Sequence, residues 1–141
     1  MKKLLFILIS VLVSQNVFSQ KVQVDSFYKF QHKETNSTYG AVDSQLTQNF
    51  GWFKDSTTYI FDTLNNSVLA IYTENGKKEV INMTIISKSE DTDAKSYNYI
   101  SSNGYFGDLV FTKNLKGNRD MFLVRYNDFN GNIVVMYTYL N

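Results

Sequence analysis

The chain has 141 residues, with 14 Lys and Arg, 13 Asp and Glu and one His, and a net charge of +1. Charges this balanced and interspersed give no basic stripe for nucleic acid and no Lys/Arg cluster for an anionic membrane. The chain has no Cys, which excludes disulfides, thiolate metal sites, a cysteine nucleophile and a lipid-modified cysteine. We therefore expect no nucleic-acid partner, no lipid anchor and a core held by packing alone.

The first 19 residues have the three-part layout of a secretory signal peptide. The parts are a basic head at Lys2 and Lys3, an apolar run from Leu4 to Val13, and a cleavage site at Val17-Phe18-Ser19. The apolar run is much shorter than the roughly 20 residues that a membrane-spanning helix needs, so membrane insertion is not expected. We expect residues 1–19 to be removed, residues 20–141 to form one β domain, and the protein to be periplasmic or secreted.

The segments that follow predict a strand and then a helix. Lys21–Gln31 is typical of a strand. In Ala41–Phe50, the apolar residues Val42, Leu46 and Phe50 recur at intervals of four, which is the spacing of one helical face. We expect a short N-terminal amphipathic helix there, placed to cover the outer face of another element.

The rest of the chain has the turn signals of a β meander. Asn-Gly occurs at 75–76, 103–104 and 130–131, and this dipeptide favours tight hairpin turns because both of its residues tolerate positive φ. The segments between turns are rich in Val, Ile, Tyr and Phe. They predict strands at Ser56–Asp62, Ser67–Glu74, Lys77–Lys88, Ser96–Ser102, Tyr105–Thr112, Asp120–Asn127 and Asn132–Leu140.

Alternation within these strands assigns one face to the core. The predicted core residues are Tyr59, Phe61, Ile81, Met83, Ile85, Leu109, Phe111, Phe122, Val124 and Tyr126. The last strand is apolar or amphipathic on both faces, which indicates that both of its faces are covered. The fold class is therefore all-β, an antiparallel meander of seven to eight strands that forms a barrel or a curled sandwich.

The residue inventory offers no catalytic constellation. His32 is the single histidine, beside charged residues at an expected strand end, and it fits an ordinary surface residue better than a general base. Ser87–Lys95 carries a cluster of carboxylates, which fits an exposed loop better than a calcium site because the EF-hand spacing is missing. We expect no cofactor, no metal and no enzymatic activity, although a pair of carboxylates brought together by the fold stays an open alternative.

Aromatic residues are the remaining signal. The chain has ten Tyr, eleven Phe and one Trp. Tyr97 and Tyr99 share one strand face, as do Tyr137 and Tyr139, and with Trp52 they are the candidate ligand-binding residues if these faces line a cup. The alternative is that they form cross-strand pairs that only stabilise the sheet.

Two resemblances bear on the fold. A helix-like segment leading into Gly51-Trp52 and followed by sequential strands resembles the calycins, the lipocalin-like group, although that family has a residue between Gly and Trp that this chain lacks. The leader ending in Phe18-Ser19-Gln20, the hairpin from Thr58 to Tyr72 and the ending from Phe122 to Tyr137 resemble small secreted β proteins of the Bacteroidota. The resemblance to the Bacteroidota proteins implies a fold and a compartment, and no activity.

Together these observations predict an exported soluble binding module. Its partner would be a small apolar or glycan-like molecule, or a protein. The alternative is a structural or adhesive cell-surface protein without a small-molecule ligand, for which flat sheet faces would serve as contact area.

Overall fold

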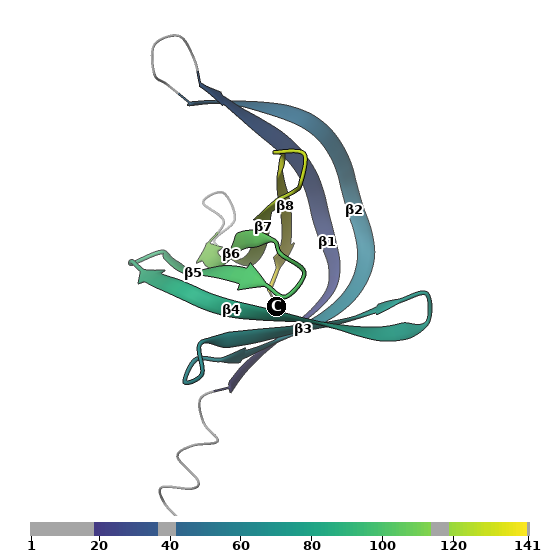
Figure 1. Ribbon diagram of the computed structural model, residues 1–141, viewed down its shortest axis with the longest axis vertical. Coiled ribbons are helices and arrows are strands. Elements are labelled where there is room, and N and C mark those ends of the chain that lie inside the picture. The colour runs from purple at the N-terminus through teal and green to yellow at the C-terminus, as the bar shows by residue number, and fades with distance from the viewer. Residues whose placement is uncertain (1–18, 37–41, 114–118, 141) are drawn as a thin grey trace, which may run out of the picture.

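The computed structural model describes residues 19–36, 42–113 and 119–140, which form one ring-like antiparallel sheet (Figure 1). The strands are β1 (Ser19–Asn36), β2 (Val42–Asp62), β3 (Ser67–Glu74), β4 (Lys77–Glu90), β5 (Ala94–Ser101), β6 (Phe106–Lys113), β7 (Asp120–Asn127) and β8 (Ile133–Tyr139). Each strand pairs with the next, and β8 returns to pair with β1. The predicted all-β meander is confirmed, and its eight strands lie in one sheet rather than two stacked sheets.

Apart from Ser19, the expected signal peptide lies outside the described residues. None of the described residues belongs to a helix long and apolar enough to cross a membrane.

The turn prediction holds in full at one of the three Asn-Gly pairs. Asn75 and Gly76 both have positive φ, at 50° and 75°. In the other two pairs only the glycine does, with φ of 88° at Gly104 and 77° at Gly131. The β7–β8 turn is wider than a two-residue hairpin, and the Asp128 carboxylate organises it by accepting hydrogen bonds from the N–H groups of Asn130 and Asn132.

The structure places Val42–Phe50 in the extended strand β2 rather than in a helix, and Ala41 lies outside the described residues. An interval of four fits a strand as well as a helix, because every second side chain of a strand shares a face. Leu46 and Phe50 remain 59% and 42% exposed, so this segment does not cover β8. On the outer face of β8, Val135 is nonetheless buried, at 6% exposed, and has Phe30 of β1 as its register partner.

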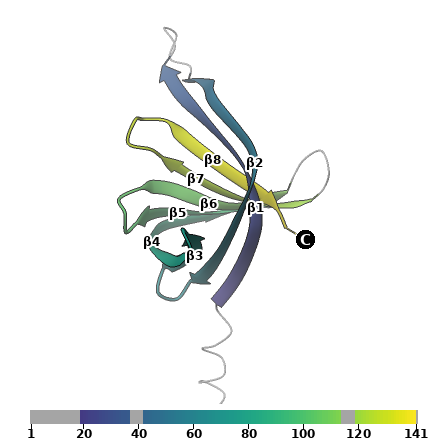
Figure 2. The ribbon, with the colours of Figure 1, turned by 90° about the vertical axis from the view of Figure 1, so that its right-hand side faces the viewer.

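β1 and β2 are much longer than the other strands, at 18 and 21 residues. They pair with each other along almost their whole length, whereas β2 pairs with β3 only from Thr57 to Asp62. The β1–β2 hairpin therefore extends beyond the ring, as Figures 1 and 2 show.

Aromatic side chains fill one end of the ring. Phe61, Tyr97, Phe111 and Phe122 meet there with ring centroids 5.0 to 6.4 Å apart. Phe61 and Phe122 have no exposed surface, and Tyr97 is 1% exposed. All ten predicted core residues lie in this core or pack against it, so the predicted inner faces are confirmed.

The segment expected to be the Ser87–Lys95 loop is mostly strand. β4 runs to Glu90 and β5 starts at Ala94, which leaves a turn of three residues. Asp91 stabilises it, because its carboxylate accepts hydrogen bonds from the N–H groups of Asp93 (2.9 Å) and Ala94 (2.8 Å). The described residues hold no group of carboxylates and His arranged to bind a metal ion.

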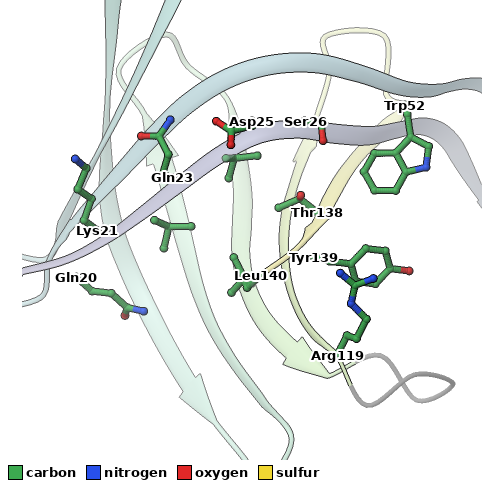
Figure 3. Close-up of a pocket in the computed structure, with 12 residues that line it drawn as sticks. Gln20, Lys21, Gln23, Asp25, Ser26, Trp52, Arg119, Thr138, Tyr139 and Leu140 are labelled. Carbon is green, nitrogen blue, oxygen red and sulfur yellow. The ribbon is translucent and has the colours of Figure 1, made fainter.

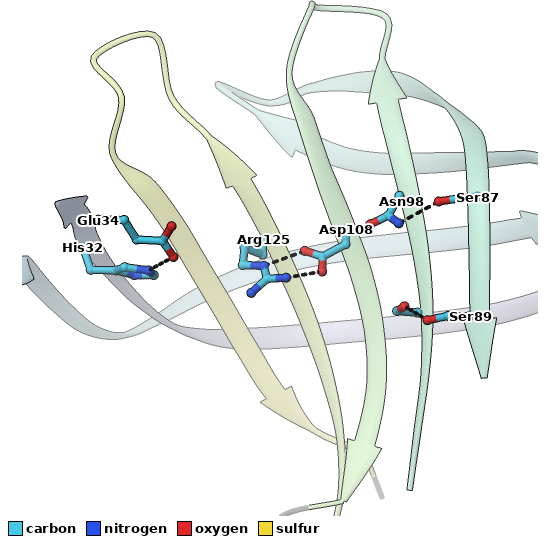
Figure 4. Close-up of polar contacts among 8 residues, drawn as sticks. His32, Glu34, Ser87, Ser89, Asn98, Asp108 and Arg125 are labelled. Carbon is cyan, nitrogen blue, oxygen red and sulfur yellow. Dashed lines mark hydrogen bonds and ion pairs between the residues drawn. The ribbon is translucent and has the colours of Figure 1, made fainter. Parts of the chain in front are cut away.

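Polar pairs cross the outer face of the ring from β4 to β7 (Figure 4). The side chain of Asn98 donates to Ser87 at 2.7 Å, and the hydroxyls of Ser89 and Ser96 lie 2.7 Å apart. The guanidinium of Arg125 donates two hydrogen bonds to the Asp108 carboxylate, at 2.8 and 2.6 Å. The Asp108 side chain is only 9% exposed, and this bidentate partner offsets the cost of burying a carboxylate there.

We expect Phe122→Ala to lower the free energy of unfolding by about 3–5 kcal/mol, because it removes a fully buried ring from the aromatic core. Phe106→Ala is the matched control, since Phe106 is 57% exposed and its loss is expected to cost less than about 0.5 kcal/mol. Urea unfolding of both variants measures the difference. Equal losses would contradict the assignment of Phe122 to the core.

The Asp108–Arg125 pair gives a second stability prediction. Arg125→Gln leaves a buried carboxylate without its charged partner, so this variant should be less stable than the double variant Arg125→Gln with Asp108→Asn. A double-mutant cycle by urea unfolding measures the stability of each variant and the coupling energy of the pair. If the double variant loses as much free energy of unfolding as the two single variants together, the pair is not coupled.

Candidate functional site

A cavity of about 420 Å³ opens at the other end of the ring. We name it the cup. Its walls are inward-facing side chains of β1 to β5, β7 and β8, together with the β5–β6 turn. The lining residues are Lys29, Phe53, Asp55, Thr57, Tyr59, Ala70, Tyr72, Glu74, Ile81, Met83, Tyr99, Ser101, Asn103, Tyr105, Val124, Tyr126 and Met136.

Five tyrosines dominate the cup wall: Tyr59, Tyr72, Tyr99, Tyr105 and Tyr126. The deepest are Tyr59 and Tyr99, which are 4% and 2% exposed. Tyr105 and Tyr126 meet edge to face with ring centroids 5.2 Å apart. Because tyrosine combines a flat apolar ring with a hydroxyl, this wall offers stacking surface and hydrogen-bonding groups together.

Gly107 on β6 makes room for this wall. It is the register partner of Tyr99 on β5 and of Tyr126 on β7. A Cβ at this position would lie 2.0 Å from the main-chain oxygen of Arg125 and 2.9 Å from the hydroxyl of Tyr99. A side chain here would therefore displace both the β7 backbone and Tyr99, which explains why the strand carries a glycine at this point.

The cup carries more negative than positive charge. Asp55 and Glu74 are its carboxylates and Lys29 is its one cation. Burial raises the pKa of Tyr59, and the negative charges that Tyr99 and Asp55 carry when ionised raise it further. The pKa of Tyr72 is raised by burial and then by Glu74 and Glu79. These hydroxyls stay protonated at neutral pH, so each can donate as well as accept a hydrogen bond.

The structure separates the five predicted ligand-binding residues into three environments. Tyr99 lies in the cup wall. Tyr97, on the same strand face, lies below it in the aromatic core. Trp52, Tyr137 and Tyr139 lie together on the opposite, outer face of the sheet, with Trp52 5.8 Å from Tyr137 and 6.3 Å from Tyr139.

Tyr28 joins Trp52, Tyr137 and Tyr139 in what we name the outer aromatic cluster. The Tyr28 ring lies 5.6 Å from Trp52 and 5.2 Å from Tyr137. Burial raises the pKa of Tyr137, and ionisation of Tyr139 and Tyr28 would raise it further. Trp52 remains 53% exposed, so the cluster presents an aromatic surface to solvent. The five predicted residues therefore do not line one common cup.

Sequence reasoning missed most of the cup. Tyr59 and Tyr126 belong to the predicted core face. The sequence pattern did not show that a cavity begins beside these two residues. Tyr72, Tyr105, Asp55 and Lys29 were not among the predicted ligand-binding residues. The signal that was available is the period-two series Phe61, Tyr59, Thr57 and Asp55, in which an inward-facing row changes from apolar to polar.

His32 has no catalytic neighbourhood in the described residues. Its side chain is 16% exposed, its Nε2 lies 3.9 Å from the Glu34 carboxylate (Figure 4), and its ring stacks on Phe30 at 6.1 Å. Nδ1 is buried and has no hydrogen-bond partner. His32 is therefore more buried than the surface histidine that the sequence predicts.

Comparison with protein families, with curated proteins and with solved structures finds no match to this chain.

The raised tyrosine pKa values predict loss of stability at alkaline pH. Tyr59 and Tyr99 have pKa values above the ordinary value, chiefly because of burial, so the unfolded chain loses these protons first. Their contribution to stability is fully present below about pH 10 and is lost as the pH rises above it.

We expect the double variant Tyr59→Phe with Tyr99→Phe to lose less stability than the wild type between about pH 9 and about pH 11. Urea unfolding across this range measures the slope for each protein, and unfolding at pH 7 gives the baseline cost of removing two hydroxyls. Parallel slopes would contradict the burial of these groups.

Proposed function

We propose that this protein is an exported binding module that holds a small, partly apolar molecule in the cup. The observation that carries the proposal is a cavity of about 420 Å³, lined by five tyrosines, in the interior of the ring. Ligand sites in proteins are concave, largely apolar and equipped with a few polar groups, and their volumes are about 300–1,000 Å³. The cup is concave and within this range of volume, and it combines aromatic rings with polar groups.

The lining favours a neutral or cationic ligand over an anionic one. Asp55 and Glu74 outnumber Lys29, and the faces of aromatic rings attract cations. A flat or ring-shaped body would stack on Tyr105 and Tyr126, while hydroxyl or amino groups would pair with the polar residues Thr57, Ser101 and Asn103. This chemistry includes the glycan-like ligands that the sequence predicts.

The compartment and the family resemblance belong to the same proposal. The leader layout supports export to the periplasm or beyond, where a soluble cup would meet small molecules that enter the cell envelope. A ring of eight antiparallel strands in sequential order, with one filled end and one open end, supports a calycin-like β-barrel as the architecture. Lipocalins hold single small ligands in barrels of this strand number.

A structural or adhesive role is the second candidate. It is favoured by apolar side chains that stand exposed along β2: Leu46 is 59%, Phe50 42% and Trp52 53% exposed. A contiguous exposed apolar surface marks contact with another macromolecule. This role predicts self-association at high concentration, which sedimentation velocity measures, whereas the binding module needs no partner copy.

Native mass spectrometry of the protein purified gently from its own host tests the cup. We expect a discrete extra mass that is lost on denaturation. Tyr126→Ala, which removes part of the cup wall, should reduce the ligand-bearing fraction about tenfold or more, whereas Tyr28→Ala on the outer face should retain it.

Circular dichroism confirms that both variants are folded before the comparison is made. A wild-type protein without extra mass, or an extra mass that Tyr28→Ala loses and Tyr126→Ala keeps, would overturn the cup as the binding site.

A further inference from the structure

The ring is closed along only part of β1. β8 pairs with β1 from Tyr28 to His32, whereas β2 pairs with β1 from Ser19 to Asn36. Within the described residues, residues 20–26 of β1 therefore have a neighbouring strand on the β2 side only, with the register interrupted at Asp25. Where β8 diverges from this edge, a pocket of about 580 Å³ separates the two strands (Figure 3). We name this pocket the seam.

Main-chain atoms form much of the seam wall. All seven consecutive residues from Gln20 to Ser26 line it on one side, and Thr138, Tyr139 and Leu140 line it on the other. Val22 and Val24 are among these residues although they are only 6% and 2% exposed, because their side chains point into the core. They face the seam with their backbone, so the seam is an unpaired strand edge rather than a side-chain groove.

An unpaired strand edge offers a row of N–H and C=O groups to any extended polypeptide. We propose that the seam binds an extended segment of another polypeptide, which adds as a strand to β1. Seven consecutive residues of β1 line the seam, so the incoming strand pairs with β1. Antiparallel pairing is the more stable arrangement per residue, and it fixes the direction of the incoming strand.

Side chains around the seam set the chemistry of the partner. Arg119 and Lys21 are its cations and Asp25 is its one carboxylate. The Arg119 guanidinium lies 4.5 Å from the centre of the Tyr139 ring, beside the outer aromatic cluster. A partner segment with an acidic side chain for Arg119 and an apolar side chain for the half-exposed Trp52 is complementary to this surface.

The seam is independent of the cup. None of the seam residues lines the cup. Trp52 is the only tryptophan of the chain, and it stands at the seam, whereas the aromatic residues of the cup are tyrosines and Phe53. Tryptophan fluorescence therefore reports on the seam, and a failure of this proposal would leave the cup untouched.

The probe is a displayed library of seven-residue peptides, selected on the full-length protein produced in its host and then synthesised singly. We expect selected peptides to carry Asp or Glu, to shift the Trp52 emission to shorter wavelength, and to protect the amides of residues 20–26 from hydrogen exchange. Methylating the peptide nitrogens one at a time should weaken binding at least tenfold at alternate positions and little at the positions between them, because only alternate N–H groups face β1.

Charge reversal supplies the matched variants. Arg119→Glu and Lys21→Glu should each weaken the selected peptides several-fold, whereas Lys78→Glu on β4, away from the seam, should leave the affinity unchanged. A titration with neutral oligosaccharides, followed by the same Trp52 emission, runs in parallel.

Four results would overturn the proposal. They are a selection that yields no binding peptide, peptides that tolerate methylation at every nitrogen, protection that falls outside β1, and a shift in Trp52 emission that oligosaccharides produce and peptides do not.

Discussion

The pairing of β1 decides most of what this protein presents to its surroundings. This strand is held by β2 along its whole length and by β8 at only five register positions, from Tyr28 to His32. The short contact is enough to close the ring, and closure gives the sheet an inside. Because the contact ends at Tyr28, the same strand leaves an open edge on its N-terminal side. The cup exists because the ring closes, and the seam exists because it closes only in part.

Along its axis, the inside of the ring consists of a part that side chains fill and a part that holds a cavity. At one end, Phe61, Tyr97, Phe111 and Phe122 pack ring against ring. At the other end the inward positions change to tyrosines, short polar residues and carboxylates, which leave a cavity of about 420 Å³. A closed ring of eight strands has an interior just wide enough for side chains to fill it or for one small ligand to occupy it. Here side chains fill one end of the ring, and the cup lies at the other end.

Strand geometry also explains why the predicted aromatic residues are not one site. Successive side chains of a strand point to opposite faces, so each pair of alternate tyrosines was correctly assigned to a shared face. Alternation does not determine whether that face points to the inside or the outside of the ring. Tyr97 and Tyr99 point inward, and Tyr137 and Tyr139 point outward, where they meet Trp52 and Tyr28. Because the sheet lies between the two pairs, no single ligand contacts both.

The sequence by itself determined the local structure of this protein. Two of the predicted strands, Ser67–Glu74 and Asp120–Asn127, match β3 and β7 at both ends, because turn residues and period-two alternation are local signals. The same alternation predicted the inward faces. For the segment from Val42 to Phe50, an interval of four residues fits both a helix and a strand, and it is pairing with β1 that gives the extended form of β2.

Tertiary structure decided the rest. Ring closure depends on pairing between β1 and β8, which are about a hundred residues apart in the chain, and no local pattern specifies such a register. The cup follows from that register, since it brings Tyr59, Tyr99 and Tyr126 from separate strands to one level of the ring, with Gly107 making space between them. A strand pattern specifies which side chains share a face, but the volume enclosed by that face depends on how every strand is staggered against its neighbours.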